Sequence, residues 1–442
     1  MQHVIELPLW TVLPFAGLLL CIAILPLLAP HFWEHNRNKG VVAALFALPV
    51  AVYLVAAHGE AGVHQLLEKG VEYLDFILLL GSLFVVSGGI VVRGSLSGTP
   101  LLNTALIGLG GLIASFVGTT GASMLLIRPL LRANAPRQRK AHVVVFFIFV
   151  VSNCGGLLTP LGDPPLFLGF LKGVPFEWTA HLWREWLLVN GALLVIFNVW
   201  DQRVFDREER ERPGSQPEEV QQHAPLDIRG RRNACFLAAI VATIYGSGSG
   251  LGSGGEPWPF GVQEGLMLAI ASGAFLATPA AYRRENGFGF GPIVEVAVLF
   301  AGIFVTMAPA LLLLNQHAAS FGLREPWQFF WATGLLSSFL DNAPTYLTFA
   351  ATASGLDGID LEGRYLAEYL AMGAPEAEIL SAISIGAVFM GANTYIGNGP
   401  NFMVKAIAEE NGVAMPGFFG YMAYSGAVLL PLFVVVTLVF FV

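Results

Sequence analysis

The chain has 442 residues, of which 55% are hydrophobic and only 12% are charged, and its mean hydropathy is +0.66. A soluble domain carries roughly 25% charged residues, so these values exclude an ordinary soluble protein and predict an all-α polytopic membrane protein. The net charge of −8 says little about partners beyond the lipid bilayer, and we expect no nucleic-acid partner. The three cysteines show no disulfide or metal-ligand spacing.

Apolar runs close to the roughly 20 residues that cross a bilayer recur along the whole chain. Runs without interruption predict ordinary spans at 9–30, 41–57, 73–92, 184–200, 233–248, 263–280, 293–314 and 417–441. The runs 141–172 and 379–408 contain Gly, Pro and polar residues in the middle and predict broken helices. The runs 101–132 and 327–354 carry polar tips, GTTGAS and DNAPTY, and predict re-entrant hairpins.

The distribution of basic residues predicts the topology. With the N-terminus outside, 18 of the 23 Lys and Arg residues fall in inside loops and five in outside loops, as the positive-inside rule requires. We therefore expect a multi-pass protein of the cell inner (plasma) membrane with both termini outside. The segment 201–232, with mixed charges and prolines, is then a solvated cytoplasmic linker.

The two halves of the chain, 1–200 and 233–442, repeat the same patterns in the same order. GLIASF (111–116) matches GLLSSF (334–339), and GDPPLF (162–167) matches GNGPNF (397–402). Each half has five spans, of which one is a broken helix, plus one hairpin. Because five is odd, the second half starts on the opposite side of the membrane, which predicts an inverted repeat. Paired broken helices in such repeats locate the central site of a transporter.

The first break, SNCGGLLTPLGDPPLF (152–167), places an acid near the middle of the membrane. A broken helix leaves free carbonyl groups on one half and free amide groups on the other. Carbonyl ends attract cations, and amide ends attract anionic groups. The break therefore makes ligand-binding backbone, and Asp163 adds a charge to it.

Polar residues at the two breaks and the two hairpin tips form the candidate ion-binding site. Carboxylate, amide and hydroxyl oxygens with few buried cations suit Na⁺. The candidates are Asp163, Asp341, Asn342, Asn153, Thr159, Thr119, Thr120, Thr345, Asn393, Thr394, Asn398 and Asn401. The alternative for each Asn or Thr is a helix cap. Asp75 and Glu295, in the first turns of paired spans, are either interfacial acids or functional ones.

HFWEH (31–35) matches the spacing of a zinc peptidase. It lies in a short connection after Pro30 with no obvious third ligand, and short motifs often match by accident. No Gly-rich phosphate loop ending in Gly-Lys-Ser or Gly-Lys-Thr occurs. We therefore do not expect an enzyme or an ATP-driven pump.

SNCGGLLTPLGDPP resembles the Asn-x-Gly-Gly…Pro-x-Gly-Asp element of NhaD-type sodium/proton antiporters, and SSFLDNAP resembles their Leu-Asp-Asn hairpin tip. These antiporters belong to the ion transporter superfamily, together with citrate–metal symporters and arsenite pumps, and the resemblance covers most of the chain. It implies scaffold helices, a mobile transport domain that moves as an elevator, and a homodimer.

The chain departs from the antiporter pattern at two places. Gly118 and Thr119 stand where those antiporters carry Asp-Asn, and GNGPNF (397–402) has no acid, like the neutral loops of carboxylate carriers. The leading hypothesis is a sodium/proton antiporter that works by alternating access, with Na⁺ and H⁺ competing for Asp163 and Asp341 and with no cofactor. The alternative is a cation-coupled symporter of citrate or another carboxylate.

Overall fold

The computed structural model describes residues 7–93, 97–211, 227–253 and 258–442. The described chain is almost entirely helical, as the composition predicts, with one pair of short antiparallel strands, β1 (Val91–Arg93) and β2 (Asp227–Arg229). The predicted linker 201–232 is described only in part, because 212–226 lies outside the described residues.

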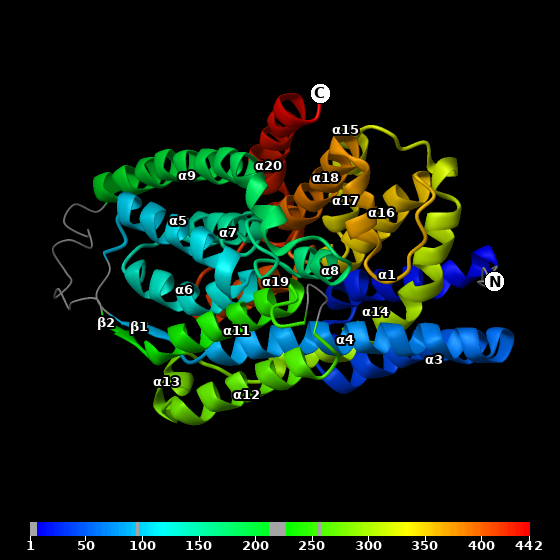
Figure 1. The fold of residues 1–442 in the computed structure, drawn as a ribbon. Coiled ribbons are helices and arrows are strands. Elements are labelled where there is room, and N and C mark those ends of the chain that lie inside the picture. Colours follow the sequence, from blue (N-terminus) through cyan, green and yellow to red (C-terminus); the bar gives the residue numbers. More distant parts are fainter. Residues whose placement is uncertain (1–6, 94–96, 212–226, 254–257) are drawn as a thin grey trace.

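One group of helices packs around the two long helices α4 and α14, and we name it the α4–α14 layer after these two helices. It consists of η1 (Leu9–Val12), α1 (Leu13–Leu28), α2 (Pro30–Trp33), α3 (Asn36–His58), α4 (Glu60–Ser87), α11 (Arg232–Gly248), α12 (Val262–Ala277), α13 (Ala280–Glu285) and α14 (Gly291–Gln316). Helix α14 contacts α1, α3 and α4, while α12 contacts α4 and α11. Helices α3, α4 and α12 run along the lower edge of the molecule in Figure 1. The layer therefore combines helices from both halves of the chain.

The remaining elements form the broken-helix group. From the first half it takes α5 (Pro100–Val117), α6 (Thr119–Ala133), α7 (Ala141–Val150), η2 (Cys154–Leu157), α8 (Pro164–Leu171), η3 (Phe176–Leu182) and α9 (Trp183–Glu211). From the second half it takes η4 (Ala318–Phe321), α15 (Pro326–Ser337), α16 (Asn342–Leu356), α17 (Tyr365–Met372), α18 (Ala374–Met390), η5 (Gly391–Asn393), α19 (Gly399–Glu410) and α20 (Phe418–Phe440). The first set lies to the upper left and α15–α18 to the upper right in Figure 1.

Proline and glycine residues decide where the two central helices break. Helix α7 ends at Val150, and α8 begins with Pro164–Pro165, whose missing N–H groups cost nothing in the first turn of a helix. Helix α18 ends at Met390, and α19 begins with Gly399–Pro400. The breaks thus lie within the runs that the sequence predicts to be interrupted.

Helices α5 and α6 run back to back and join at Gly118, whose φ of +81° suits only glycine. Their far ends are tied together, because Asn103 on α5 and the C-cap residue Asn134 of α6 exchange two hydrogen bonds of 2.9 and 2.8 Å. Helices α15 and α16 also contact each other, across a four-residue connection.

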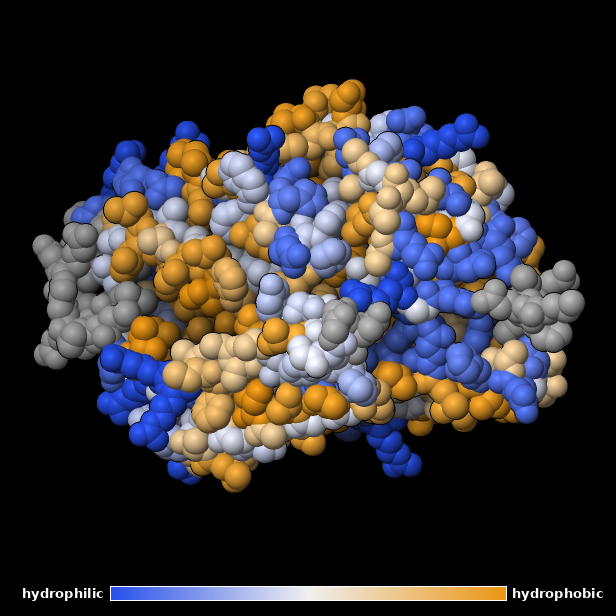
Figure 2. Space-filling view, in the orientation of Figure 1, coloured by the Kyte–Doolittle hydropathy of each residue, from blue (hydrophilic) through white to orange (hydrophobic). Residues whose placement is uncertain are grey.

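Burial separates lipid-facing helices from central ones. Helix α3 exposes Val41, Leu45, Leu48 and Val52 along one side, whereas every residue of α7 from His142 to Val150 is buried. Apolar residues also cover much of the lower helices in Figure 2. Among the described residues, eight helices are long and apolar enough to cross a membrane. The prediction of a polytopic, all-α membrane protein is therefore confirmed.

Two predicted boundaries differ from the structure. The span predicted to begin at residue 73 begins at Glu60, so Asp75 lies well inside α4 instead of in its first turn. The boundary was wrong because hydropathy marks only the apolar part of a helix, and the first turns of α4 are polar. Helix α9 likewise continues through charged residues to Glu211, which makes the start of the predicted linker helical.

Candidate functional site

Four helices begin at one point inside the broken-helix group. Thr119 and Asn342 are the first residues of α6 and α16, and Asp163 and Asn398 are the N-cap residues of α8 and α19. All four side chains are almost completely buried. The structure thus brings together the α5–α6 and α15–α16 junctions, which the sequence predicts to be hairpin tips, and the two breaks.

The carboxylate of Asp163 joins these four helix ends by hydrogen bonds. Its Oδ1 atom accepts from Thr119 Oγ1 at 2.8 Å and from Asn398 Nδ2 at 3.2 Å. Its Oδ2 atom accepts from the side-chain amide of Asn342. All three donors are neutral, so no side-chain cation among these partners cancels the charge of the carboxylate.

The side-chain amides of Asn153 and Asn401 lie behind the residues that contact Asp163. Asn398 Nδ2 also donates to Asn153 Oδ1 at 3.2 Å, and Asn153 Nδ2 donates to Asn401 Oδ1 at 2.7 Å. Asn401 Nδ2 in turn donates to the backbone carbonyls of Gly391 and Thr394. These amides fix one another's orientation, so Asn153 and Asn401 position the residues around Asp163 without contacting it.

Thr159 and Thr394 tie each break to the neighbouring hairpin. Thr159 Oγ1 donates to the carbonyl oxygen of Ser115 on α5, and Thr394 Oγ1 donates to that of Ser338 at the end of α15. Each threonine also accepts from the amide two residues later at 3.2 Å. These bonds use the hydroxyl groups of both threonines, which therefore shape the breaks.

The remaining candidates lie beside the centre. Asp341 is the N-cap of α16 and accepts from the backbone amide of Ala343 at 3.1 Å, and Thr345 donates to the Asp341 carbonyl at 2.9 Å. Asn393 donates to Ser338 Oγ at 2.9 Å. Thr120 is half-buried in the first turn of α6. Asp341 thus has the contact of a helix cap and is not a hydrogen-bonding partner of Asp163.

Helices α9 and α20 donate hydrogen bonds to the two breaks, and the polar patterns in the sequence did not predict these contacts. Trp186 and Asn190 of α9 donate to the carbonyls of Gly155 and Cys154 in the first break. Tyr421 and Ser425 of α20 donate to the carbonyls of Ala392 and Asn393 in the second. Tyr421 lies 235 residues after Trp186, and Ser425 lies 235 residues after Asn190. The same offset relates GDPPLF to GNGPNF, so it could have revealed these residues in the sequence.

The two acids with open roles have different surroundings. Glu295 on α14 forms an ion pair of 2.6 Å with the buried Lys39 of α3, inside the α4–α14 layer. Asp75 lies on α4 in the same layer, and its Oδ1 atom is buried. Neither acid belongs to the set that surrounds Asp163.

The histidines of HFWEH lie at the surface. The side chain of His31 on α2 is 99% exposed and lies 3.5 Å from Glu34, and His35 precedes α3. No group of three or more His, Cys, Asp or Glu side chains that could hold a metal ion occurs within the described ranges.

Helix ends give the site its electrostatic character. Free N–H groups at the start of a helix carry a partial positive charge, which favours anions nearby. Four such ends surround Asp163, and Asp163 is itself one anion that they stabilise. The site combines a single buried carboxylate, side-chain amide and hydroxyl groups, and the positive ends of four helix dipoles. Such a set can hold a cation at the carboxylate and an anion at the helix ends.

Comparison with known proteins assigns the chain to a family. No curated protein matched it. A family model, CitMHS_2, described as "Putative citrate transport", matched residues 4–441. This match covers nearly the whole chain, and the family is part of the superfamily that the breaks and hairpin tips resemble. The chain therefore belongs to the CitMHS_2 citrate transport family and is a multi-pass membrane transporter.

Proposed function

We propose that this protein is a secondary transporter that carries citrate or another carboxylate together with a coupling cation. The observation that carries the proposal is the meeting of four helix N-termini around one buried carboxylate, Asp163. The positive ends of the helix dipoles favour an anion, and Asp163 supplies the charge for a cation. The family match supports the same substrate class.

In this proposal the coupling cation binds between Asp163 and oxygen atoms of the neighbouring residues. Asn342 is well placed, because its Oδ1 atom is buried and has no hydrogen-bonding partner among the residues described, while its Nδ2 atom donates to Asp163. Thr119 offers a hydroxyl oxygen 2.8 Å from the carboxylate. A bound cation would neutralise Asp163, which would remove its repulsion of an incoming carboxylate. Coupling follows from this order of binding.

Alternating access completes the proposal. We propose that the two halves form an inverted repeat and that the broken-helix group moves as a body against the α4–α14 layer. Paired contacts support the repeat, since Thr159 and Thr394 bind the matching carbonyls of Ser115 and Ser338. In this arrangement α5–α6 and α15–α16 are re-entrant hairpins and both chain termini lie outside the plasma membrane.

Uptake by purified protein in liposomes tests the proposal. Labelled citrate is added outside with an inward Na⁺ gradient, with a divalent cation, or with neither, and a pH-sensitive dye is enclosed. We expect citrate uptake that depends on the cation. Empty liposomes provide the background, and succinate tests whether other carboxylates compete. Protein-containing liposomes that take up no carboxylate under any of these conditions would contradict the proposal.

Sodium/proton exchange is the second candidate, and the burial of Asp163 favours it. A carboxylate that is 1% exposed can bind either a proton or Na⁺, and this competition would give antiport. The same liposomes separate the two candidates. A Na⁺-driven change in internal pH without citrate indicates exchange, whereas citrate accumulation indicates symport.

A further inference from the structure

A buried cluster of charged side chains lies at the opposite end of α8 from Asp163. Lys172 follows the last residue of α8, and Glu72 lies on α4 one turn after Lys69. Glu72 Oε1 accepts from Lys172 Nζ at 2.5 Å and from Lys69 Nζ at 2.9 Å. Lys172 is 4% exposed and Glu72 is 9% exposed. This ion pair therefore joins the broken-helix group to the α4–α14 layer.

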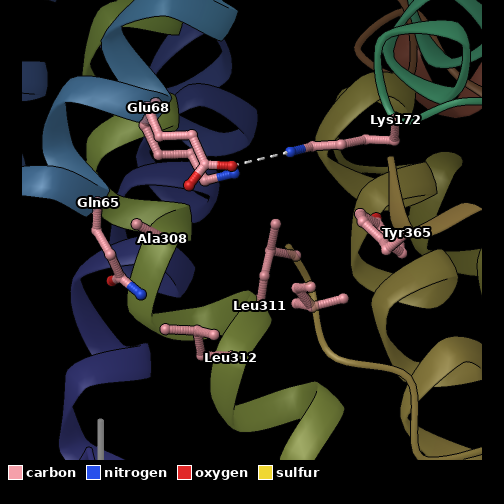
Figure 3. A pocket seen from close by; sticks show the side chains of 9 residues that line it. Gln65, Glu68, Lys172, Ala308, Leu311, Leu312 and Tyr365 are labelled. Carbon is pink, nitrogen blue, oxygen red and sulfur yellow. Dashed lines mark ion pairs between the residues drawn. The ribbon is translucent and has the colours of Figure 1, made fainter. Parts of the chain in front are cut away.

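The cluster borders a cavity between the two groups of helices. In Figure 3, Lys172 extends from one side toward Glu68 of α4, and Leu311 and Leu312 of α14 line the cavity below. The distance from Lys172 Nζ to Glu68 Oε1 is 3.7 Å. Hydrophilic residues gather in Figure 2 between the lower layer and the helices at the upper right. Gln65, Glu68, Lys69 and Lys172 line the cavity, so the boundary between the groups is polar there.

Lys172 is fixed to the broken-helix group. Its carbonyl oxygen accepts from the amide of Leu366 on α17 at 3.0 Å, and its ammonium group lies 5.7 Å from the ring centroid of Tyr365. Glu72 is fixed to α4 through the helix backbone. A displacement of one group along the other that exceeds the reach of the Lys172 side chain therefore separates Lys172 from Glu72.

Lys69 makes this separation reversible. A buried charge that loses its partner is strongly destabilising. After Lys172 leaves, Glu72 still has Lys69 on its own helix at 2.9 Å, and water in an opened cavity can hydrate the ammonium group of Lys172. The pair therefore favours the closed arrangement without preventing the open one.

We propose that the Glu72–Lys172 ion pair is a conformational latch. It holds the broken-helix group against the α4–α14 layer in the state described here and opens when that group moves. The inference rests on the proposed function, because a latch of this kind requires a transporter whose two groups move relative to each other.

Distances between spin labels test the latch without any measurement of transport. One label is attached at Val63 on α4 and one at Met372 on α17, both exposed positions, in a full-length chain whose three natural cysteines are replaced by alanine. The measurement is made in lipid bilayers without cargo. Lys172→Met should raise the population of molecules at a second label distance, relative to the population at the main distance, by about tenfold or more, because it removes one partner of a buried pair.

Lys39 provides a matched control. Lys39 is also 4% exposed and forms an ion pair of 2.6 Å, but its partner Glu295 lies in the same layer. Lys39→Met should therefore leave the distance distribution unchanged. Lys172→Arg should restore the distribution of the unmutated chain, since arginine keeps the charge.

Glu72→Gln decides the question if Lys172→Met does not yield folded protein. It should shift the distances in the same direction, because it leaves the buried ammonium group of Lys172 with only Glu68, at 3.7 Å, as a charged partner. An unchanged distribution in folded Lys172→Met or Glu72→Gln would overturn the latch, as would an equal shift in Lys39→Met. These results are separate from the proposed function, which fails if the unmutated protein takes up no carboxylate.

Discussion

The two broken helices have the same backbone construction and different charges. Each break contains two glycines six residues apart, and the second lies close to the carbonyl oxygen of the first. These pairs are Gly156 and Gly162 in the first break and Gly391 and Gly397 in the second. The N-cap residues that follow, Asp163 and Asn398, have nearly equal angles, with φ of −144° and −151° and ψ of 144° and 139°. The backbone therefore does not require an acid at this position.

The difference in charge between Asp163 and Asn398 bears on the role of Asp163. Asn398 occupies the equivalent position without a charge and still contacts both Asn153 and Asp163. A neutral amide would be cheaper than a carboxylate inside a membrane. We therefore propose that a ligand, and not folding, explains the charge at Asp163, and four sets of variants test this distinction in order of decreasing effect.

The largest effect is expected from adding a methyl group at either break. A Cβ atom at position 162 would lie 2.0 Å from Gly156 O, and one at 397 would lie 2.6 Å from Gly391 O. Gly162→Ala and Gly397→Ala should each destabilise the fold by about 3 kcal/mol, measured as thermal unfolding in detergent. Gly399→Ala is the control, because its Cβ would meet open space. Tolerance at one break alone would show that the two are not equivalent.

Asp163→Asn should affect transport but not folding. We expect cation-dependent citrate uptake to fall by about ten- to a hundredfold, because a charge-assisted contact to the cation is worth about 1.5–3 kcal/mol. The unfolding temperature should stay within a few degrees, since an amide fits this backbone at Asn398 and Asn342 can turn its Oδ1 atom toward the new amide group. A large drop in unfolding temperature would instead assign the carboxylate a structural role.

Asn398→Asp reverses the comparison by placing a second acid beside the first. The Nδ2 atom of Asn398 lies 3.2 Å from Asp163 Oδ1, so two carboxylates would repel each other and an incoming anion. We expect citrate uptake at pH 8 to fall by about fivefold and to recover toward pH 6, because one shared proton relieves the repulsion. Equal loss at both pH values would argue against this explanation.

Asp341→Asn should have the smallest effect. Asp341 caps α16 through its contact with Ala343, and Asn caps a helix as well as Asp does. Uptake should change by less than about twofold, whereas Asp341→Ala should cost about 1 kcal/mol of stability. Loss of uptake in Asp341→Asn as severe as in Asp163→Asn would make Asp341 a second ion ligand.

Several features of this molecule follow from local sequence alone. The apolar runs predict the helices because every backbone group must be hydrogen-bonded inside a bilayer. Pro164–Pro165 and Gly399–Pro400 predict the restarts of the broken helices, since the first turn of a helix is where proline is favoured. Hydropathy predicts the apolar centre of α4. It does not predict the start of α4, because hydropathy does not detect a polar extension of a helix.

The packing of the helices, and not the local sequence, determines which polar side chains contact one another. Asp163 and Asp341 look alike in the sequence, yet one lies at the centre of four helix ends and the other accepts a bond from its own helix. The contact between Glu72 and Lys172 has no signal in the sequence, because the two residues lie on separate helices whose packing brings them together. Local chemistry determined the helices and their breaks, whereas long-range packing selected the partners of each charge.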